Sequence, residues 1–165
     1  MQNILILGAG RSATSLINYL LVNAGKEEWF VTVADYSLET AKDKVKGNNN
    51  AKAIAFDINN VEDRKLRIGD ADLVISMLPA SFHILVAHDC VELGINLITA
   101  SYVSPEMSAL DNKAKEKGVL LLNECGLDPG IDHMSAMKVI DMIREKGHEL
   151  ISFESFTGGL LAPGN

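Results

Sequence analysis

Short runs of Ile, Leu, Val and Ala alternate along this chain with longer segments in which apolar residues recur every three or four positions. Runs that are apolar at consecutive positions are typical of strands buried on both faces of a parallel sheet. The longer segments have the period of amphipathic helices and would supply the crossovers that parallel strands require. The predicted strands are Asn3–Leu7, Phe30–Ala34, Ala51–Phe56, Leu73–Met77, Asn96–Thr99 and Val119–Leu122. The predicted helices are Ser12–Asn23, Leu38–Lys46, Val61–Arg67, Phe82–Leu93, Pro105–Lys117 and Ile131–Lys146.

This alternation of strand and helix predicts an α/β fold of the Rossmann type, with a doubly wound, mainly parallel sheet and helices on both faces. Two serines stand where helix caps are expected: Ser37 precedes Leu38, and Ser104 precedes a proline at a first helical position. Glycines follow four of the helical segments, where a left-handed residue commonly ends a helix. They are Gly25, Gly94, Gly118 and Gly147.

The 165 residues suffice for one domain and are too few for a second of similar size. Residues 1–150 are expected to form that domain. Apolar and polar residues alternate over Glu149–Thr157, which predicts a further strand, and the glycine-rich residues 158–165 predict a loop. We therefore expect residues 151–165 to be a strand and loop that lead into a second, substrate-binding domain absent from this sequence.

Charge and composition exclude several kinds of partner. The chain has 15 Lys and Arg against 22 Asp and Glu, a formal net charge of −7, and its basic residues form no cluster that would neutralise a nucleic-acid backbone. No apolar run approaches the ~20 residues that span a bilayer, and no secretory segment follows Met1. Two cysteines, Cys90 and Cys125, make no disulfide framework. These features predict a cytoplasmic protein with a small-molecule partner, and neither a nucleic acid nor a membrane.

A glycine-rich turn lies between the first predicted strand and the first predicted helix. Its sequence, Gly-Ala-Gly-Arg-Ser-Ala, fits the pattern G-x-G-x-x-A, in which glycines permit a tight turn and a close approach of a pyrophosphate to the backbone. The helix that follows would offer free N–H groups to the phosphates. The residues predicted to bind a dinucleotide here are Gly8, Gly10, Arg11, Ser12 and Ala13. The alternative is a tight turn without a ligand.

Asp35 ends the second predicted strand, 25 residues after Gly10. A carboxylate at this place can accept hydrogen bonds from both hydroxyls of an adenosine ribose, and it would repel a 2′-phosphate. The sequence therefore predicts NAD as the cofactor, with NADP as the second possibility. A simpler interpretation is that Asp35 caps the next helix, a task for which Ser37 is also suited.

Further candidates follow the third, fourth and fifth predicted strands. Ligands of open α/β sheets bind beyond the carboxyl ends of the strands, so these positions should border the cofactor. The candidates are Asp57, Leu78, Pro79, Thr99, Ser101 and Tyr102. Asp57 is nearly as well explained as a solvated loop residue, and Pro79 as a strand terminator.

Residues 123–133 are the least ordinary part of the sequence, a polar loop in which glycines flank Asp128-Pro129. Asp128 or His133 could serve in catalysis, although an Asp-Pro-Gly turn followed by a capping Asp132 is a structural alternative. Cys125 is expected in the core. His83, His88 and His148 have no metal-ligand spacing and are expected to be solvated or packed. The helical spacing of three methionines predicts a core position for Met134, Met137 and Met142.

Four stretches together resemble saccharopine dehydrogenase of the L-glutamate-forming type, also called saccharopine reductase. They are residues 8–13, 99–107, 123–133 and 156–163, and the resemblance extends over almost the whole chain. The runs Ser-Tyr-Val-Ser-Pro and Gly-Leu-Asp-Pro-Gly-Ile-Asp-His are far more specific than the glycine pattern. The chain departs from the family at residues 155–159, Ser-Phe-Thr-Gly-Gly, where the family commonly has Ser-Tyr-Cys-Gly-Gly. No role of that cysteine is therefore transferred.

The resemblance implies an oxidoreductase of lysine metabolism that oxidises the secondary amine of saccharopine with a nicotinamide cofactor. The imine then hydrolyses to L-glutamate and 2-aminoadipate 6-semialdehyde, and the reverse reaction is a reductive condensation. The resemblance places Ser101, Tyr102 and Asp128 beside the substrate, with Asp128 and Tyr102 as the catalytic candidates. It assigns the cofactor to the strand ends at Asp35, Asp57, Leu78, Pro79 and Thr99.

The resemblance also implies that the arginines that hold the substrate carboxylates belong to the absent domain. This chain alone should then bind cofactor without turning over saccharopine, and the full-length form is a possible homodimer. Two alternatives stay open. One is a dehydrogenase of another amino-acid or polyamine secondary amine, and the other is a non-catalytic domain that senses NAD(P).

Overall fold

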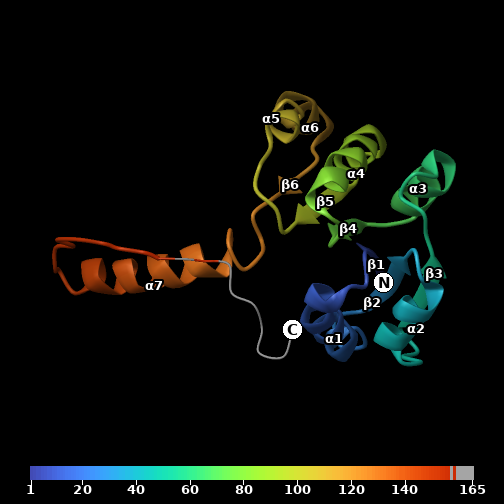
Figure 1. Ribbon diagram of the computed structural model, residues 1–165, viewed down its shortest axis with the longest axis horizontal. Helices are drawn as coiled ribbons and strands as arrows, with labels where there is room; N and C mark the ends of the chain where they lie inside the picture. The colour runs from blue at the N-terminus through green and yellow to red at the C-terminus, as the bar shows by residue number, and fades with distance from the viewer. Residues whose placement is uncertain (157, 159–165) are drawn as a thin grey trace.

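The computed structural model describes residues 1–156 and 158, and its centre is a six-stranded sheet in which every pair of neighbouring strands is parallel (Figure 1). The strands are β1 (Gln2–Leu7), β2 (Trp29–Asp35), β3 (Ala51–Ala55), β4 (Leu73–Ser76), β5 (Asn96–Thr99) and β6 (Leu121–Leu122). Their order is β3-β2-β1-β4-β5-β6. The order reverses direction at β1, which is the doubly wound arrangement.

Helices connect the strands. They are the short 3-10 helix η1 (Arg11–Ala13), α1 (Thr14–Asn23), α2 (Leu38–Val45), α3 (Val61–Gly69), α4 (Ala80–Leu93), α5 (Pro105–Ser108), α6 (Asp111–Lys117) and α7 (Ile131–Glu145). The six strands and six helices predicted up to Lys146 are all found. The predicted helix Ser12–Asn23 begins as η1, and the predicted helix Pro105–Lys117 is divided into α5 and α6 around Ala109 and Leu110. Thus the predicted Rossmann-type fold is correct.

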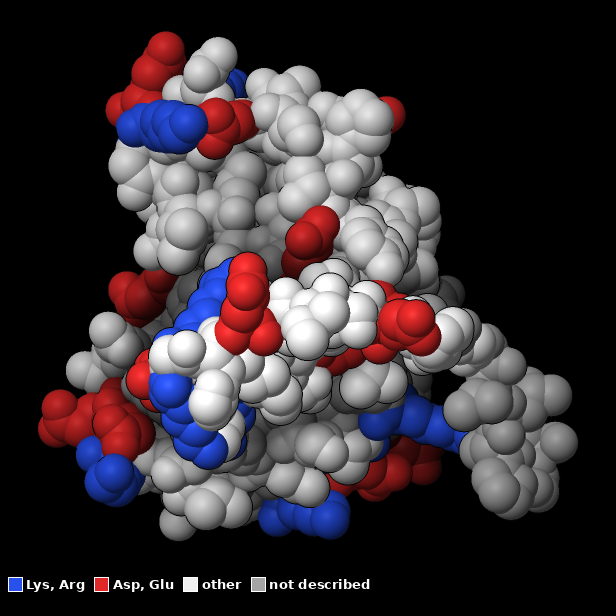
Figure 2. All heavy atoms as spheres, turned by 90° about the vertical axis from the view of Figure 1, so that its left-hand side faces the viewer, with Lys and Arg blue, Asp and Glu red and all other residues white. Residues whose placement is uncertain are grey.

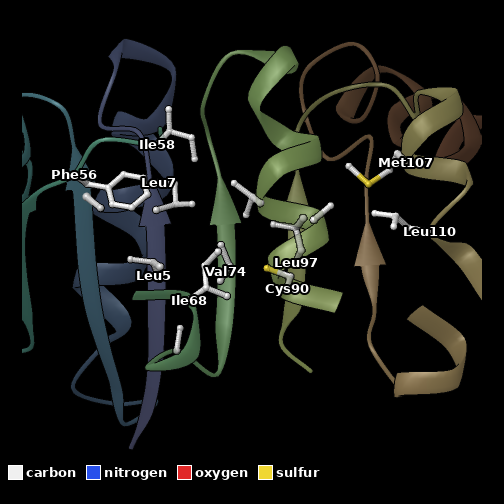
Figure 3. Packing of buried hydrophobic residues seen from close by; sticks show 14 residues of the cluster. Leu5, Leu7, Phe56, Ile58, Ile68, Val74, Cys90, Leu97, Met107 and Leu110 are labelled. Atoms are coloured by element: carbon white, nitrogen blue, oxygen red, sulfur yellow. The ribbon is translucent and has the colours of Figure 1, made fainter. Parts of the chain in front are cut away.

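Helices cover both faces of the sheet. Successive side chains of a strand point to opposite sides, so consecutive apolar residues contribute to a buried cluster on each face. Leu5 and Leu7 of β1 belong to one buried cluster, with residues of α3, α4 and α5 (Figure 3). Ile4 and Ile6 belong to a second cluster, with residues of α1 and α2. β1 is therefore buried from both sides, which explains why its sequence is apolar at consecutive positions.

Several predicted helix ends are confirmed. The side chains of Ser37 and Ser104 accept hydrogen bonds from the N–H of Thr40 and Met107, each at 3.2 Å. Among the four predicted glycine stops, three have positive φ and follow a helix: Gly94, Gly118 and Gly147. The prediction for Gly25 is wrong, because α1 runs on into a right-handed Ala24 and the positive φ of that turn lies at Glu28.

The predicted strand over Glu149–Thr157 is not found in its described part, residues 149–156. A strand requires a hydrogen-bonded neighbour, and the described residues offer none to this segment. Thr157 and residues 159–163 of the family-like stretch lie outside the described residues.

Helix α7 projects from the body of the molecule (Figure 1), and none of its residues is buried. The core positions predicted for Met134, Met137 and Met142 are therefore wrong for these residues, all of which are exposed. The three methionines do lie on a helix, but the body of the fold does not cover α7. Figure 2 shows this side of the molecule, where basic and acidic side chains are intermingled. Across the described residues, no helix is both long and apolar enough to cross a membrane.

Candidate functional site

The glycine turn follows β1 at the carboxyl edge of the sheet. Gly8 has φ +99°, a conformation that L side chains rarely adopt. A Cβ added to Gly8 would lie 2.9 Å from the carbonyl oxygen of Met77, which follows β4. Gly8 donates its own N–H to the carbonyl of Ala34 at 2.8 Å. Glycine is thus required at position 8 so that the turn can pass between β2 and β4.

Gly10 serves a different purpose. Its φ is −61°, and an added Cβ would meet no protein atom within 4 Å. Among the described residues no acceptor is found for the N–H groups of Gly10, Arg11 or Ser12, whereas Ala13 is 1% exposed and packs into the core. An open backbone surface with free N–H groups at the start of a helix fits a pyrophosphate.

Asp35 stabilises this turn from the end of β2. Its Oδ2 accepts the N–H of Ala9 at 2.7 Å, and its Oδ1 accepts the N–H of Ser37 at 2.9 Å. Ser37 itself caps α2, so the interpretation of Asp35 as that helix cap is wrong. The neighbouring Tyr36 is exposed. Each carboxylate oxygen keeps a second lone pair, which can accept a ribose hydroxyl.

Three other predicted residues lie at the same edge with simpler surroundings. Asp57 is exposed, and its Oδ1 accepts hydrogen bonds from the backbone N–H of Asn59 at 2.9 Å and from its side chain at 3.1 Å. Leu78 is half-buried, and Pro79 is the exposed residue that precedes α4. A cofactor role for these three residues stays a prediction.

Beyond β5, a histidine and an asparagine join the predicted residues. Thr99 is buried and donates its hydroxyl to Oδ1 of Asn123 at 3.0 Å. Oγ of Ser101 lies 2.9 Å from Nε2 of His83, and Nδ1 of the same ring lies 2.8 Å from Oγ of Ser76. These contacts connect the end of β4, the end of β5 and the loop after β6.

Tyr102 and Asp128 meet although they are 26 residues apart in sequence. The Tyr102 hydroxyl donates to Oδ1 of Asp128 at 2.7 Å, and both side chains are exposed. That hydrogen bond, together with the negative charge of Asp128, raises the pKa of Tyr102 above its ordinary value. The structure therefore brings together the two side chains that the resemblance marks as catalytic.

Asp132 and His133 stand beside this pair at the start of α7. Oδ1 of Asp132 accepts the N–H of Gly130 at 2.9 Å and lies 2.8 Å from Nδ1 of His133. Their mutual hydrogen bond lowers the pKa of Asp132 and raises that of His133. Asp128, Asp132 and His133 each offer one atom that could bind a metal ion, and these three atoms lie within 4.8 Å of one another. The sequence spacing did not suggest this proximity.

A cavity of about 480 Å³ opens between α4, the loop after β5 and the loop after β6. His83, Thr99, Ser101, Tyr102, Glu106 and Asn123 are among its lining residues. Cys125 does not line it and is exposed, so its predicted core position is wrong. The cavity gathers the predicted residues Thr99, Ser101 and Tyr102 into one place.

Sequence reasoning missed His83 and Asn123. His83 was expected to be solvated or packed and is 3% exposed with both ring nitrogens bonded. The signal available was its position: His83 is three residues before Val86 and seven before Cys90, on the apolar face of α4. A polar residue on such a face needs a buried partner.

The Tyr102–Asp128 contact makes a testable prediction. Replacing Asp128 by Asn removes the negative charge, so the Tyr102 phenol should ionise at a lower pH than in the unmodified chain. Phenolate absorbance against pH measures this, and Tyr102→Phe identifies which of the three tyrosines is responsible. Asp141→Asn on α7 is the control and should leave the Tyr102 curve unmoved. An unchanged curve in Asp128→Asn would show that the contact does not form in solution.

The fold and the glycine turn define a dinucleotide-binding domain of the Rossmann type. The profile described as "Saccharopine dehydrogenase NADP binding domain" matches residues 4–122, and "Saccharopine dehydrogenase C-terminal domain" matches residues 126–165. The chain belongs to the saccharopine dehydrogenase family. The second match begins at residue 126, whereas the sequence pattern predicted that the lead into a further domain begins at residue 151.

Individual relatives agree with this assignment. The chain is 37% identical over 163 residues to saccharopine dehydrogenase [NADP(+), L-glutamate-forming] of Schizosaccharomyces pombe, covering 99% of this chain and 36% of that protein. It is 39% identical over 179 residues to alpha-aminoadipic semialdehyde synthase of Arabidopsis thaliana, covering 98% of this chain and 17% of that protein. The apo structure of saccharopine dehydrogenase (L-Glu forming) from Saccharomyces cerevisiae superposes with a TM-score of 0.78 at 35% identity, covering 89% of this chain and 32% of that one. The chain thus spans well under half of each relative.

The comparisons also bear on the cofactor. The matching profile and the S. pombe relative both carry NADP in their descriptions, so they support NADP and give no support to NAD as the main cofactor.

Proposed function

We propose that this chain is the cofactor-binding part of an oxidoreductase that interconverts saccharopine with L-glutamate and 2-aminoadipate 6-semialdehyde in lysine metabolism. The observation that carries the proposal is the shared edge of the sheet. There, the open backbone at Gly10 lies at the end of β1, and the Tyr102–Asp128 pair adjoins the end of β5. The names of the relatives supply the substrate class.

The residues divide into two groups with different tasks. Gly10, Arg11 and Ser12 would hold the pyrophosphate, and Asp35 would accept a ribose hydroxyl. A bound nicotinamide would take the hydride from the carbon beside the secondary amine, or return it in the reverse direction. Asp128 would accept the amine proton, and the Tyr102 hydroxyl would hold its carboxylate in place. A domain that only senses NAD(P) would need no such pair.

Asp35 bears on the choice between the two forms of the cofactor. Its carboxylate lies at the turn where a ribose 2′-phosphate of NADP would approach. We propose that the chain binds NADP, as its family does. We also propose that the charge of Asp35 lowers the affinity for NADPH relative to that for NADH.

The prediction compares NADH and NADPH titrated calorimetrically into the chain and into Asp35→Asn. The variant keeps an oxygen for Ala9 but loses the charge, so its affinity for NADPH relative to NADH should rise about fivefold or more. Like charges a few ångströms apart repel by about 1 kcal/mol even in water. Asp43→Asn is the control, because it removes the same charge from an exposed residue of α2. An unchanged ratio contradicts the role of Asp35, and a wild-type chain that binds neither cofactor contradicts the proposed function.

Three earlier expectations stay predictions. They are the cytoplasmic location, the absence of a nucleic-acid or membrane partner, and a homodimer of the full-length form. Within the described part of the chain, Cys90 is buried, Cys125 is exposed, and both are free thiols.

A further inference from the structure

His83 joins the ends of two neighbouring parallel strands. Its Nδ1 lies 2.8 Å from the hydroxyl of Ser76, the last residue of β4, and its Nε2 lies 2.9 Å from the hydroxyl of Ser101, two residues after β5. Ser76 is 0% exposed and His83 is 3% exposed. Burial lowers the pKa of the imidazole, so the ring is neutral at neutral pH, with one nitrogen donating and the other accepting.

The surroundings of Ser76 decide which nitrogen carries the proton. A buried hydroxyl hydrogen needs an acceptor, and among the described residues the only partner found for the Ser76 hydroxyl is Nδ1 of His83. Ser76 therefore donates to Nδ1, which must be unprotonated. The proton of the neutral ring is then on Nε2, and Nε2–H donates to Oγ of Ser101.

This direction leaves the hydrogen of the Ser101 hydroxyl free. Ser101 is half-buried and lines the 480 Å³ cavity, so its O–H can donate to a ligand there. No Lys or Arg is among the described residues that line the cavity, and Glu106 contributes a negative charge. An uncharged carbonyl oxygen fits these surroundings better than a carboxylate does.

We propose that His83 is a positioning residue that orients the Ser101 hydroxyl as a hydrogen-bond donor to the carboxamide oxygen of the nicotinamide. This inference rests on the proposed function, because it assigns the cavity to the nicotinamide end of the cofactor. His83 acts through Ser101, and Ser101 alone touches the ligand.

Two substitutions separate the two bonds of the ring. A glutamine side chain reaches as far as Nε2 and can still donate to Ser101, whereas an asparagine side chain reaches only as far as Nδ1. His83→Asn should therefore weaken NADPH binding by about three- to tenfold, the value of one hydrogen bond, and His83→Gln should weaken it much less. His88→Asn is the matched control, because His88 is an exposed residue of the same helix.

A second probe locates the effect at the nicotinamide. 2′-Phospho-ADP-ribose lacks that ring, so its affinity should be the same in the wild-type chain and in His83→Asn. In a chain that already carries Ser101→Ala, adding His83→Asn should cause no further loss of NADPH affinity. Equal losses with both probes, or additive losses with Ser101→Ala, would overturn the proposal.

The tautomer is measured directly by the nitrogen chemical shifts of the His83 ring in the ligand-free chain. Protonation at Nε2 is expected, and protonation at Nδ1 would overturn the inference whatever the affinities are. If the wild-type chain binds neither probe, the proposed function fails and the ligand assignment fails with it. If it binds both, with no difference between NADPH and 2′-phospho-ADP-ribose in His83→Asn, only this inference fails.

Discussion

Replacing Asp89 by Ala should lower the free energy of unfolding by about 3–5 kcal/mol, because it leaves the buried guanidinium of Arg64 without its partner. Nε of Arg64 lies 2.6 Å from Oδ2 of Asp89, and the two side chains are 8% and 6% exposed. Arg64 also donates to the carbonyl of Ile58 at 2.6 Å. The pair therefore connects α3, α4 and the loop before α3. Urea unfolding followed by circular dichroism measures the loss.

Two further variants show whether the cost comes from an unpaired buried charge. Replacing both partners, as Arg64→Met with Asp89→Leu, should recover much of the lost stability. Glu92→Ala removes an exposed partner of Lys65 on the same two helices and should leave the urea midpoint almost unchanged. Equal losses in Asp89→Ala and Glu92→Ala would contradict the assignment of the stability to the buried pair.

The Arg64–Asp89 pair also shows what the sequence could not predict. The two residues are 25 positions apart on separate helices, and Arg64 stands among charged residues of α3, where a solvated position is the ordinary expectation. Strands and helices could be predicted because their signals are local: apolar runs, helical spacing and glycine stops. A buried ion pair depends on which two helices lie side by side, and that depends on the whole fold.

The candidate site also contains some features that the sequence could predict and others that it could not. The glycine turn was predictable because its signal is local. Gly8 meets a backbone requirement at its own position, and Gly10 leaves the backbone surface open to a phosphate.

The family resemblance placed Tyr102 and Asp128 beside one substrate but did not predict their hydrogen bond. Neither the local patterns nor the resemblance predicted the bridge from Ser76 through His83 to Ser101. The methionines of α7 failed in the opposite way, since their spacing indicates an apolar helical face and does not tell what covers it.

A side chain at position 8 should lower the stability of the fold, whereas a side chain at position 10 should weaken cofactor binding. Gly8→Ala places a Cβ 2.9 Å from the Met77 carbonyl at φ +99°, so it should lower the free energy of unfolding by about 1–3 kcal/mol. Gly10→Val meets no protein atom within 4 Å of its Cβ and keeps an ordinary φ of −61°, so its urea midpoint should be close to that of the unmodified chain.

Gly8→Ala should lose more stability than Gly10→Val, but Gly10→Val should lose more affinity for the cofactor. The Gly10→Val side chain fills the space that a pyrophosphate needs beside the free N–H groups of the turn. Losing two charge-assisted hydrogen bonds of about 1.5 kcal/mol each should weaken NADPH binding by about two orders of magnitude. Calorimetric titration of the folded variant measures this. Gly147→Ala, beyond α7, is the control for Gly8→Ala, because it also replaces a glycine with positive φ but lies away from the turn. A folded Gly10→Val chain with unchanged affinity would show that the phosphates do not bind at this turn, because the substitution alters the open surface and leaves the fold that presents it intact.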